Sequence, residues 1–164
     1  MKLEDFEHIW VVDFEFGSKP GELPQPRCAV FKEIRGGGLH QIWLEGVKAP
    51  PAPLRWGVGD IMVAFYASAE FGCLFELDWP LPVNALDLFT EFRCLHNGLP
   101  LPAGNSLLGA LVRYGLSHID ASEKEFFREL ALRGGIYSPQ ERKDLVAYCL
   151  SDVEAEAALF EAMK

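Results

Sequence analysis

The segment Ile9–Phe16 reads Ile-Trp-Val-Val-Asp-Phe-Glu-Phe and is the most apolar strand-like stretch of the chain. β-Branched and aromatic residues favour extended backbone, and successive side chains of a strand point to opposite faces of its sheet. Asp13 and Glu15 therefore share one face with Val11, and the residues between them point to the other. A strand this apolar is expected near the centre of a sheet, so the fold must place two acids in largely apolar surroundings.

Two ionised carboxylates a few ångströms apart, flanked by aromatic rings, repel each other strongly unless a cation or a proton offsets their charge. A hard divalent cation suits such oxygen ligands. On a solvated strand edge, however, Asp13 and Glu15 would need no ligand, and from these residues alone that alternative stays open. The strand predicts a pair of candidate metal ligands.

The composition indicates an ordinary globular protein. With 164 residues, 49% of them hydrophobic and 24% charged, the chain is expected to form one domain over residues 1–164. Its apolar runs are shorter than the ~20 residues of a membrane helix, and its acidic N-terminus lacks the zones of a secretory signal, so we expect a cytoplasmic protein without a membrane partner. The four cysteines, none of them in a CxxC pair, are predicted to be reduced core residues.

The net charge of −9 argues against a protein that grips long duplex DNA through a basic surface. A protein that holds only a few terminal nucleotides, with cations neutralising its carboxylates, can still be acidic. The run Glu123-Lys124-Glu125 is predicted to be a solvated helix face.

Residue patterns predict strands first and helices afterwards. The expected strands are Ile9–Phe16, Cys28–Arg35 and Leu39–Leu44, arranged as an antiparallel meander, followed by the buried strand Ile61–Tyr66. The expected helical segments are 68–76, 106–114, 121–133 and 139–162, with a strand-to-helix segment over 83–96. This order predicts an α/β fold with a mixed sheet flanked by helices.

The last helix begins at Ser138-Pro139, because serine caps free amides and proline suits the first helical position. Within it, Tyr148 and Asp152 are four residues apart and should project from one face. Alone, this pair is as easily explained by a surface contact.

The chain resembles the DEDD exonucleases of the DEDDy type. The specific resemblance is to the proofreading exonuclease domain of family A DNA polymerases in their bacterial and phage-like forms. Val12-Asp13-Phe14-Glu15 is similar to the first motif, and Tyr148-Cys149-Leu150-Ser151-Asp152-Val153 is similar to the third. The resemblance covers essentially the whole chain, although only the motifs are specific. It implies an RNase H-like (DnaQ-like exonuclease) fold, with a five-stranded mixed sheet whose first three strands are antiparallel.

The second motif departs from the family pattern. Related phage-type domains read approximately Ala-His-Asn-Ala-x-Phe-Glu, where this chain has Ala64-Phe65-Tyr66-Ala67-Ser68-Ala69-Glu70. Glu70 would be the third acid, in the first turn of the helix after a buried strand. The competitor is Asp87, in a segment that resembles the one following the second motif, and we favour Glu70.

The resemblance implies two divalent ions, Mg²⁺ or Mn²⁺, and hydrolysis of the terminal phosphodiester at the 3′ end of single-stranded DNA, with release of nucleoside monophosphates. It implies that Asp13 bridges both ions, that Glu15 and Asp152 complete the site of the ion that activates water, and that Glu70 serves the second ion. The Tyr148 hydroxyl would orient the attacking water, because it can donate and accept hydrogen bonds while neutral.

Two other functions stay open. The altered second motif fits an inactive module that guides DNA within a polymerase, and the same acids fit an RNA-trimming exoribonuclease of the superfamily. The end of the chain at Glu161–Lys164 has no tail or glycine cap. It fits a fragment of a longer DNA polymerase as well as a free-standing protein, so the expected partners are a single-stranded 3′ end and a linked or separate polymerase domain. We expect a monomer.

Overall fold

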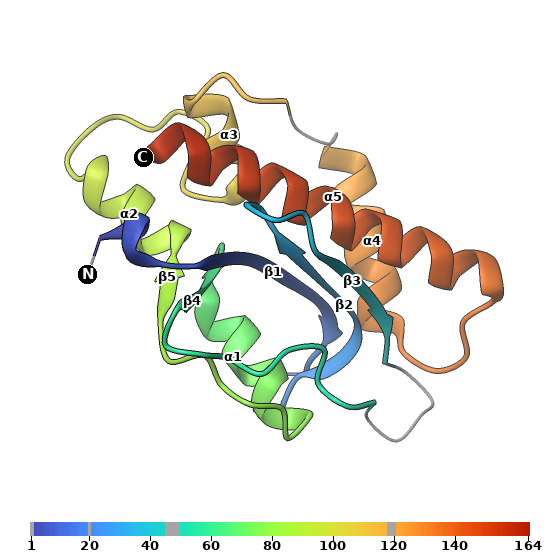
Figure 1. Cartoon of the computed structure of the whole chain (residues 1–164). Coiled ribbons are helices and arrows are strands. Elements are labelled where there is room, and N and C mark those ends of the chain that lie inside the picture. The colour runs from blue at the N-terminus through green and yellow to red at the C-terminus, as the bar shows by residue number, and fades with distance from the viewer. Residues whose placement is uncertain (1, 20, 45–49, 118–120) are drawn as a thin grey trace.

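A mixed sheet with the spatial order β3-β2-β1-β4-β5 forms the centre of the molecule (Figure 1). The computed structural model describes residues 2–19, 21–44, 50–117 and 121–164. Its strands are β1 (His8–Gly17), β2 (Gln25–Glu33), β3 (Leu39–Trp43), β4 (Asp60–Ala64) and β5 (Ala85–Asp87). The pairs β1–β2 and β2–β3 are antiparallel, whereas β1–β4 and β4–β5 are parallel. The predicted α/β fold with an antiparallel meander at its start is confirmed.

Helices cover both faces of this sheet. A short 3-10 helix, η1 (Leu3–Asp5), precedes β1; the α-helices are α1 (Ala67–Glu76), α2 (Leu88–Leu95), α3 (Leu107–Arg113), α4 (Ala121–Arg133) and α5 (Pro139–Met163). The long α5 crosses one face of the sheet beside α4, and α1 lies on the opposite face (Figure 1). Within the described ranges, no helix combines the length and apolar character needed to cross a membrane.

The side chains of β1 alternate between two hydrophobic cores. Val11 packs in the core that lies under α5, together with Leu145 and Val153 of that helix. Val12 and Phe14 belong to the second core, which lies on the α1 side. The predicted alternation is therefore correct, and it leaves Asp13 and Glu15 on the α5 face of the central strand.

The second strand begins three residues before the predicted Cys28 and ends two residues before Arg35, and the fourth strand also ends two residues early. The strand expected over Ile61–Tyr66 ends at Ala64, and Tyr66 adopts a left-handed conformation with φ 77° at the N-cap of α1. The Tyr66 amide donates a hydrogen bond to Asp87 Oδ1 (3.0 Å), which holds this tight turn. The chain thus passes from strand to helix earlier than apolar patterning predicts.

The cysteine prediction holds for three positions and fails for the fourth. Cys28, Cys73 and Cys149 are free and buried. Cys94 is free but exposed, because it lies on the outer side of α2, whose inner side buries Leu88 and Phe92.

Candidate active site

The acids Asp13 and Glu15 lie on the central strand β1, beyond the end of its neighbour β4. The parallel pairing of β1 with β4 ends at Val11 and Val63, so Asp13 and Glu15 lie beyond the last pair. On the other side, β2 continues to pair with both residues. In open sheets, ligands bind where parallel strands end and the chain turns into helices. The fold therefore opens a position beside Asp13 and Glu15, both of which are partly buried.

A third carboxylate reaches the same position from α5. Oxygen atoms of Asp13, Glu15 and Asp152 lie within 4.8 Å of one another. It is the only cluster of three or more potential metal-ligating acids, histidines or cysteines found among the described residues. Residues separated by more than 130 positions in sequence are brought together because α5 packs across β1.

Mutual repulsion and burial make this trio unstable as three free anions. Burial, with added repulsion from Asp152, raises the pKa of Asp13 from its ordinary value of 3.8 to about 7. Burial raises the pKa of Glu15 well above its ordinary value as well, and repulsion from Asp13 adds to this effect. Burial also raises the pKa of Asp152, although Lys124 and the Tyr148 hydroxyl oppose the shift. The site retains protons near neutral pH unless a cation takes their place.

Tyr148 lies beside the trio with its ring held in place. The ring stacks on Phe127 of α4, with 4.7 Å between centroids and an interplanar angle of 18°. Its hydroxyl hydrogen-bonds to Asp152, and burial raises the pKa of Tyr148 far above its usual range. The hydroxyl is therefore neutral at physiological pH, and the structure brings Tyr148 and Asp152 together as their helical spacing predicted.

Glu70 reaches the site from the opposite face of the sheet. It lies in the first turn of α1, its side chain is only 3% exposed, and its Oε2 has no hydrogen-bond partner among the described residues. The Phe14 amide donates a hydrogen bond to the carboxylate, and burial followed by repulsion from Asp13 raises the pKa of Glu70. The structure thus brings Glu70 and Asp13 close together.

Asp87, the competing third acid, has another role. Its Oδ1 accepts hydrogen bonds from the backbone amides of Tyr66 (3.0 Å) and Phe89 (3.0 Å). Its Oδ2 accepts from the Thr90 hydroxyl at 3.2 Å. Asp87 therefore caps α2 and fixes the β4–α1 turn, and its carboxylate is already supplied with donors.

Two residues beside the acids were not among the predicted site residues. Glu156 lies one turn beyond Asp152 in α5, is buried, and interacts electrostatically with Asp13 and Asp152. The four-residue spacing that links Tyr148 to Asp152 also links Asp152 to Glu156, so this signal was present. Lys124 forms an ion pair with Asp152 at 3.9 Å. The predicted solvated helix face agrees with the exposed side chains of Lys124 (41%) and Glu125 (61%), while the side chain of Glu123 lies outside the described residues. The prediction did not include the contact of Lys124 with the acids, which the packing of α4 against α5 produces.

A cavity of about 420 Å³ opens beside the acids. Asp13, Asp152 and Glu156 line one part of it. Aromatic residues line another part, where the ring centroid of Phe89 lies 5.2 Å from that of Tyr66. The Tyr66 side chain is 53% exposed. A bulky residue in a left-handed conformation is rare and is typical of functional sites.

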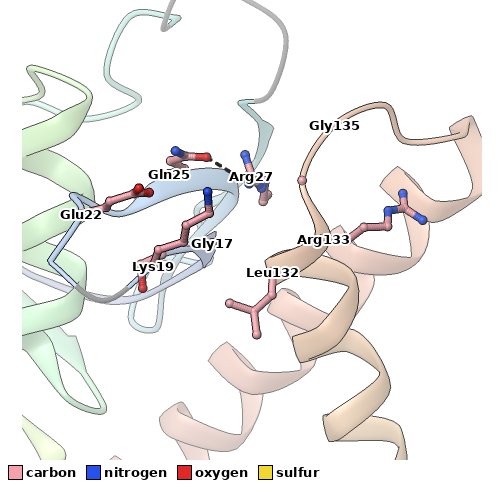
Figure 2. Close-up of a pocket in the computed structure, with 10 residues that line it drawn as sticks. Gly17, Lys19, Glu22, Gln25, Arg27, Leu132, Arg133 and Gly135 are labelled. Atoms are coloured by element: carbon pink, nitrogen blue, oxygen red, sulfur yellow. Dashed lines mark hydrogen bonds between the residues drawn. The ribbon is translucent and has the colours of Figure 1, made fainter.

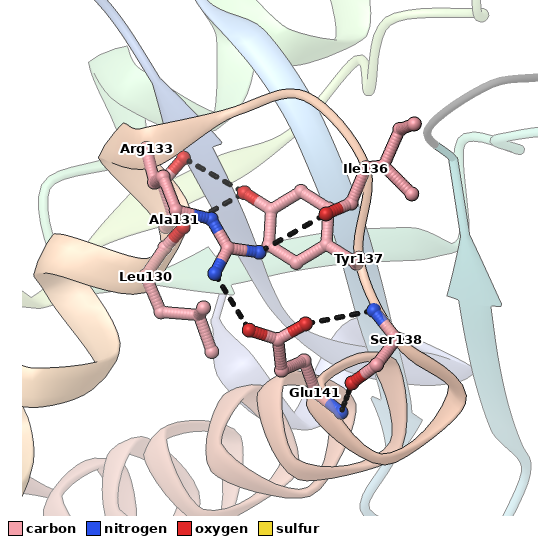
Figure 3. A network of polar contacts seen from close by, with 7 residues as sticks. All are labelled: Leu130, Ala131, Arg133, Ile136, Tyr137, Ser138 and Glu141. Atoms are coloured by element: carbon pink, nitrogen blue, oxygen red, sulfur yellow. Dashed lines mark hydrogen bonds and ion pairs between the residues drawn. The ribbon is translucent and has the colours of Figure 1, made fainter.

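Polar contacts at the α4–α5 junction hold α4 in place (Figure 3). The buried Tyr137 hydroxyl donates to the Leu130 carbonyl at 2.7 Å, and Arg133 pairs with Glu141 at 2.6 Å. Glu141 and Ser138 form a capping box at the start of α5. These contacts fix the helix that carries Lys124 and Phe127.

A second cavity, of about 240 Å³, lies where β1 ends near the C-terminal end of α4 (Figure 2). On its wall, the buried Arg27 of β2 donates from Nε to the Ala131 carbonyl of α4 at 3.2 Å, and from Nη2 to Gln25 Oε1 at 3.3 Å. Arg27 thereby ties α4 directly to the sheet, which complements the junction with α5.

The donor set suits hard divalent cations. The candidate ligands are all carboxylate oxygens, which Mg²⁺ and Mn²⁺ accept. The buried Oε2 atoms of Glu70 and Glu156 have no hydrogen-bond partner in the described part of the chain. A bound cation would satisfy such oxygens and relieve the repulsion among the acids.

No protein-family model and no curated protein matches this sequence. Among solved structures, the chain is similar to the Nibbler EXO domain of Aedes aegypti, with a TM-score of 0.53 and 10% sequence identity. The match covers 95% of this chain and 80% of that one. At this identity the similarity shows a shared fold, and the order of the mixed sheet agrees with it. The chain has an RNase H-like fold, with acidic residues that could hold a metal ion grouped beside its central strand.

Proposed function

We propose that this chain is a metal-dependent 3′–5′ exonuclease, which hydrolyses the terminal phosphodiester of single-stranded DNA and releases nucleoside monophosphates. The observation that carries the proposal is the convergence of Asp13, Glu15 and Asp152 within 4.8 Å. Tyr148 lies beside them, and the fold is shared with an exonuclease domain. The similarity of the first and third motifs to DEDDy exonucleases supports the direction of hydrolysis and the DNA substrate.

In this proposal Asp13, Glu15 and Asp152 would hold one divalent cation, and Asp13 with Glu70 would hold a second. When bound, such ions lower the pKa of water and neutralise charge on a phosphate undergoing in-line displacement. The residues of the chain provide the oxygen ligands and fix their positions. Asp13 would belong to both sets of ligands, because it lies on the central strand between α1 and α5.

Tyr148 orients the attacking water. Its hydroxyl proton is engaged with Asp152, so the phenolic oxygen can accept a hydrogen bond from water. This directs a lone pair of the water away from the tyrosine. Phe127 stacks on the ring and prevents it from rotating out of position. The raised pKa of Tyr148 means that the hydroxyl does not itself serve as a base near pH 7.

The cavity beside the acids is suited to the terminal nucleotide. Its aromatic side chains, Tyr66 and Phe89, offer surface to a base, and stacking of this kind tolerates any base sequence. Lys124, which also lines the cavity, is positioned to meet a phosphate. Binding of only the terminal nucleotide is compatible with the net charge of −9, because the protein needs to contact few phosphates.

We further propose that the domain proofreads for a DNA polymerase, present either in the same polypeptide or as a separate protein. The motif resemblance supports this context. A primer extension assay with a polymerase tests it, since proofreading requires that mispaired 3′ ends are removed faster than paired ones.

The basic experiment follows degradation of a 5′-labelled single strand in Mn²⁺. A ladder that shortens one nucleotide at a time from the 3′ end, and that a 3′-terminal phosphorothioate linkage slows, supports the proposal. Shortening from the 5′ end or internal cuts would contradict it. An RNA strand of the same sequence is assayed beside the DNA, because only contacts to the 2′-hydroxyl distinguish the two. Binding of single strands without hydrolysis would favour the inactive module instead.

A further inference from the structure

Glu156 is a buried acid that none of the recognised motifs contains. It lies in α5, one turn after Asp152 and two turns after Tyr148, on the side of the helix that faces the sheet. Its side chain is 2% exposed, yet it lines the same cavity as Asp13 and Asp152. A glutamate that only supported the hydrophobic core would be expected to have all its oxygens bonded.

The hydrogen bonding of Glu156 is incomplete. The Phe65 amide donates to the carboxylate, but Oε2 has no partner in the described part of the chain. Protonation does not solve the problem, because a protonated Oε2 would itself need an acceptor. Lys124, the nearby cation, pairs with Asp152. Oε2 of Glu156 can therefore serve as a ligand for a cation.

Glu70, on the other side of Asp13, also has an incompletely hydrogen-bonded carboxylate. Its Oε2 is also buried and unpartnered, and its charge interacts with both Asp13 and Glu156. Three carboxylates from three different elements, β1, α1 and α5, thus interact electrostatically around Asp13. Two of them carry the only carboxylate oxygens found buried and unpartnered within the described residues. This group overlaps the trio of Asp13, Glu15 and Asp152 at Asp13 alone.

We propose that Glu156 is a fifth carboxylate of the metal site and that, with Glu70 and Asp13, it holds the second divalent cation. The inference rests on the proposed metal-dependent function and extends it to a residue outside the motifs. It also balances the local charge: two divalent cations and Lys124 together neutralise the five carboxylates. Carboxylate oxygen ligands favour Mg²⁺ or Mn²⁺ over softer metals.

Mn²⁺ titration calorimetry of the purified protein, in the absence of nucleic acid, tests the inference. The wild type should bind two ions, and Glu156→Gln should keep the first while weakening the second by about tenfold or more. The matched control is Glu154→Gln, which makes the same substitution on an exposed position of the same helix and should bind as the wild type. Equal binding of both ions by Glu156→Gln and the wild type would overturn the inference, as would binding of fewer than two ions by the wild type.

A wild-type crystal soaked in Mn²⁺ keeps the test independent of how the variant folds. An anomalous peak in contact with Glu156 Oε2 is expected, and two peaks that both leave Glu156 without a contact would refute the role. Nuclease activity is measured separately on the same preparation. Two bound ions without release of monophosphates would contradict the proposed function and leave the assignment of Glu156 intact.

Discussion

The thiol of Cys149 in α5 donates a hydrogen bond to Asp13 Oδ2 at 3.2 Å, and it also approaches the Asp13 carbonyl at 3.3 Å. Cys149 is fully buried and therefore has no alternative orientation toward solvent. The contact joins the central strand to the helix that carries Asp152. It also fixes the rotamer of the acid that both proposed ion positions share.

Cys149→Ala should lower kcat of the nuclease by about tenfold, because partners of metal ligands commonly contribute this much. Cys149→Ser should recover most of the loss, since a hydroxyl can donate the same hydrogen bond. Steady-state release of monophosphates in Mn²⁺ measures both. The matched control is Cys94→Ala, an exposed thiol on α2, which should behave as the wild type. Equal activity of Cys149→Ala and Cys94→Ala would show that the thiol does not position Asp13.

Tyr148→Phe should lower kcat about 100-fold while leaving KM nearly unchanged, because it removes only the hydroxyl that orients water. The ring and its stacking on Phe127 are retained. Single-turnover degradation of an oligonucleotide separates this chemical step from binding. Tyr114→Phe, a tyrosine that packs beside His96 outside the cavity, serves as the control. A change in KM alone would argue that Tyr148 binds substrate and has no part in the chemical step.

Tyr66→Ala should raise KM about tenfold if the ring stacks on the terminal base, because such stacking contributes about 1–3 kcal/mol per base. Tyr66→Phe should restore the wild-type KM, since the face of the ring is sufficient. Phe75→Ala removes an exposed aromatic residue from the far end of the same helix and should have no effect. The wild type should also degrade a strand with an abasic 3′ end more slowly. If the abasic end is degraded at the normal rate, the base is held elsewhere.

Without metal, the protein should lose stability as the pH rises. The pKa of Asp13 is 3.8 when unperturbed and about 7 in the folded chain, so between these values the folded state binds more protons than the unfolded state. The free energy of unfolding must then fall with rising pH over this range. Urea unfolding in EDTA at pH 5 and pH 7.5 measures the difference, and Asp13→Asn should reduce it. Added Mn²⁺ should restore stability at pH 7.5. Stability that rises with pH in EDTA would contradict the account.

The parts of the site that follow local periodicity were predictable from sequence. Alternation along a strand assigns Asp13 and Glu15 to one face, and helical spacing places Tyr148 beside Asp152. Such patterns depend only on the local backbone, which is why they survive in the structure.

The remaining features depend on contacts between distant elements. Lys124 reaches Asp152 only because α4 packs against α5, and nothing in the residues around it indicates this. The choice between Glu70 and Asp87 depends on which carboxylate the turn at Tyr66 engages. A left-handed tyrosine is also unexpected, because residues with large side chains avoid that conformation.

The central claim is that a cation held by Asp13 and its neighbours supports removal of the 3′-terminal nucleotide. The most direct measurement uses a single-stranded oligonucleotide labelled on its last residue, incubated with wild type or Asp13→Asn in Mn²⁺ or in EDTA. The account predicts that the label appears as a nucleoside 5′-monophosphate only with the wild type in Mn²⁺, and that Asp13→Asn falls to the level seen in EDTA. Equal release by Asp13→Asn in Mn²⁺, or no release by the wild type from DNA or RNA, would contradict it.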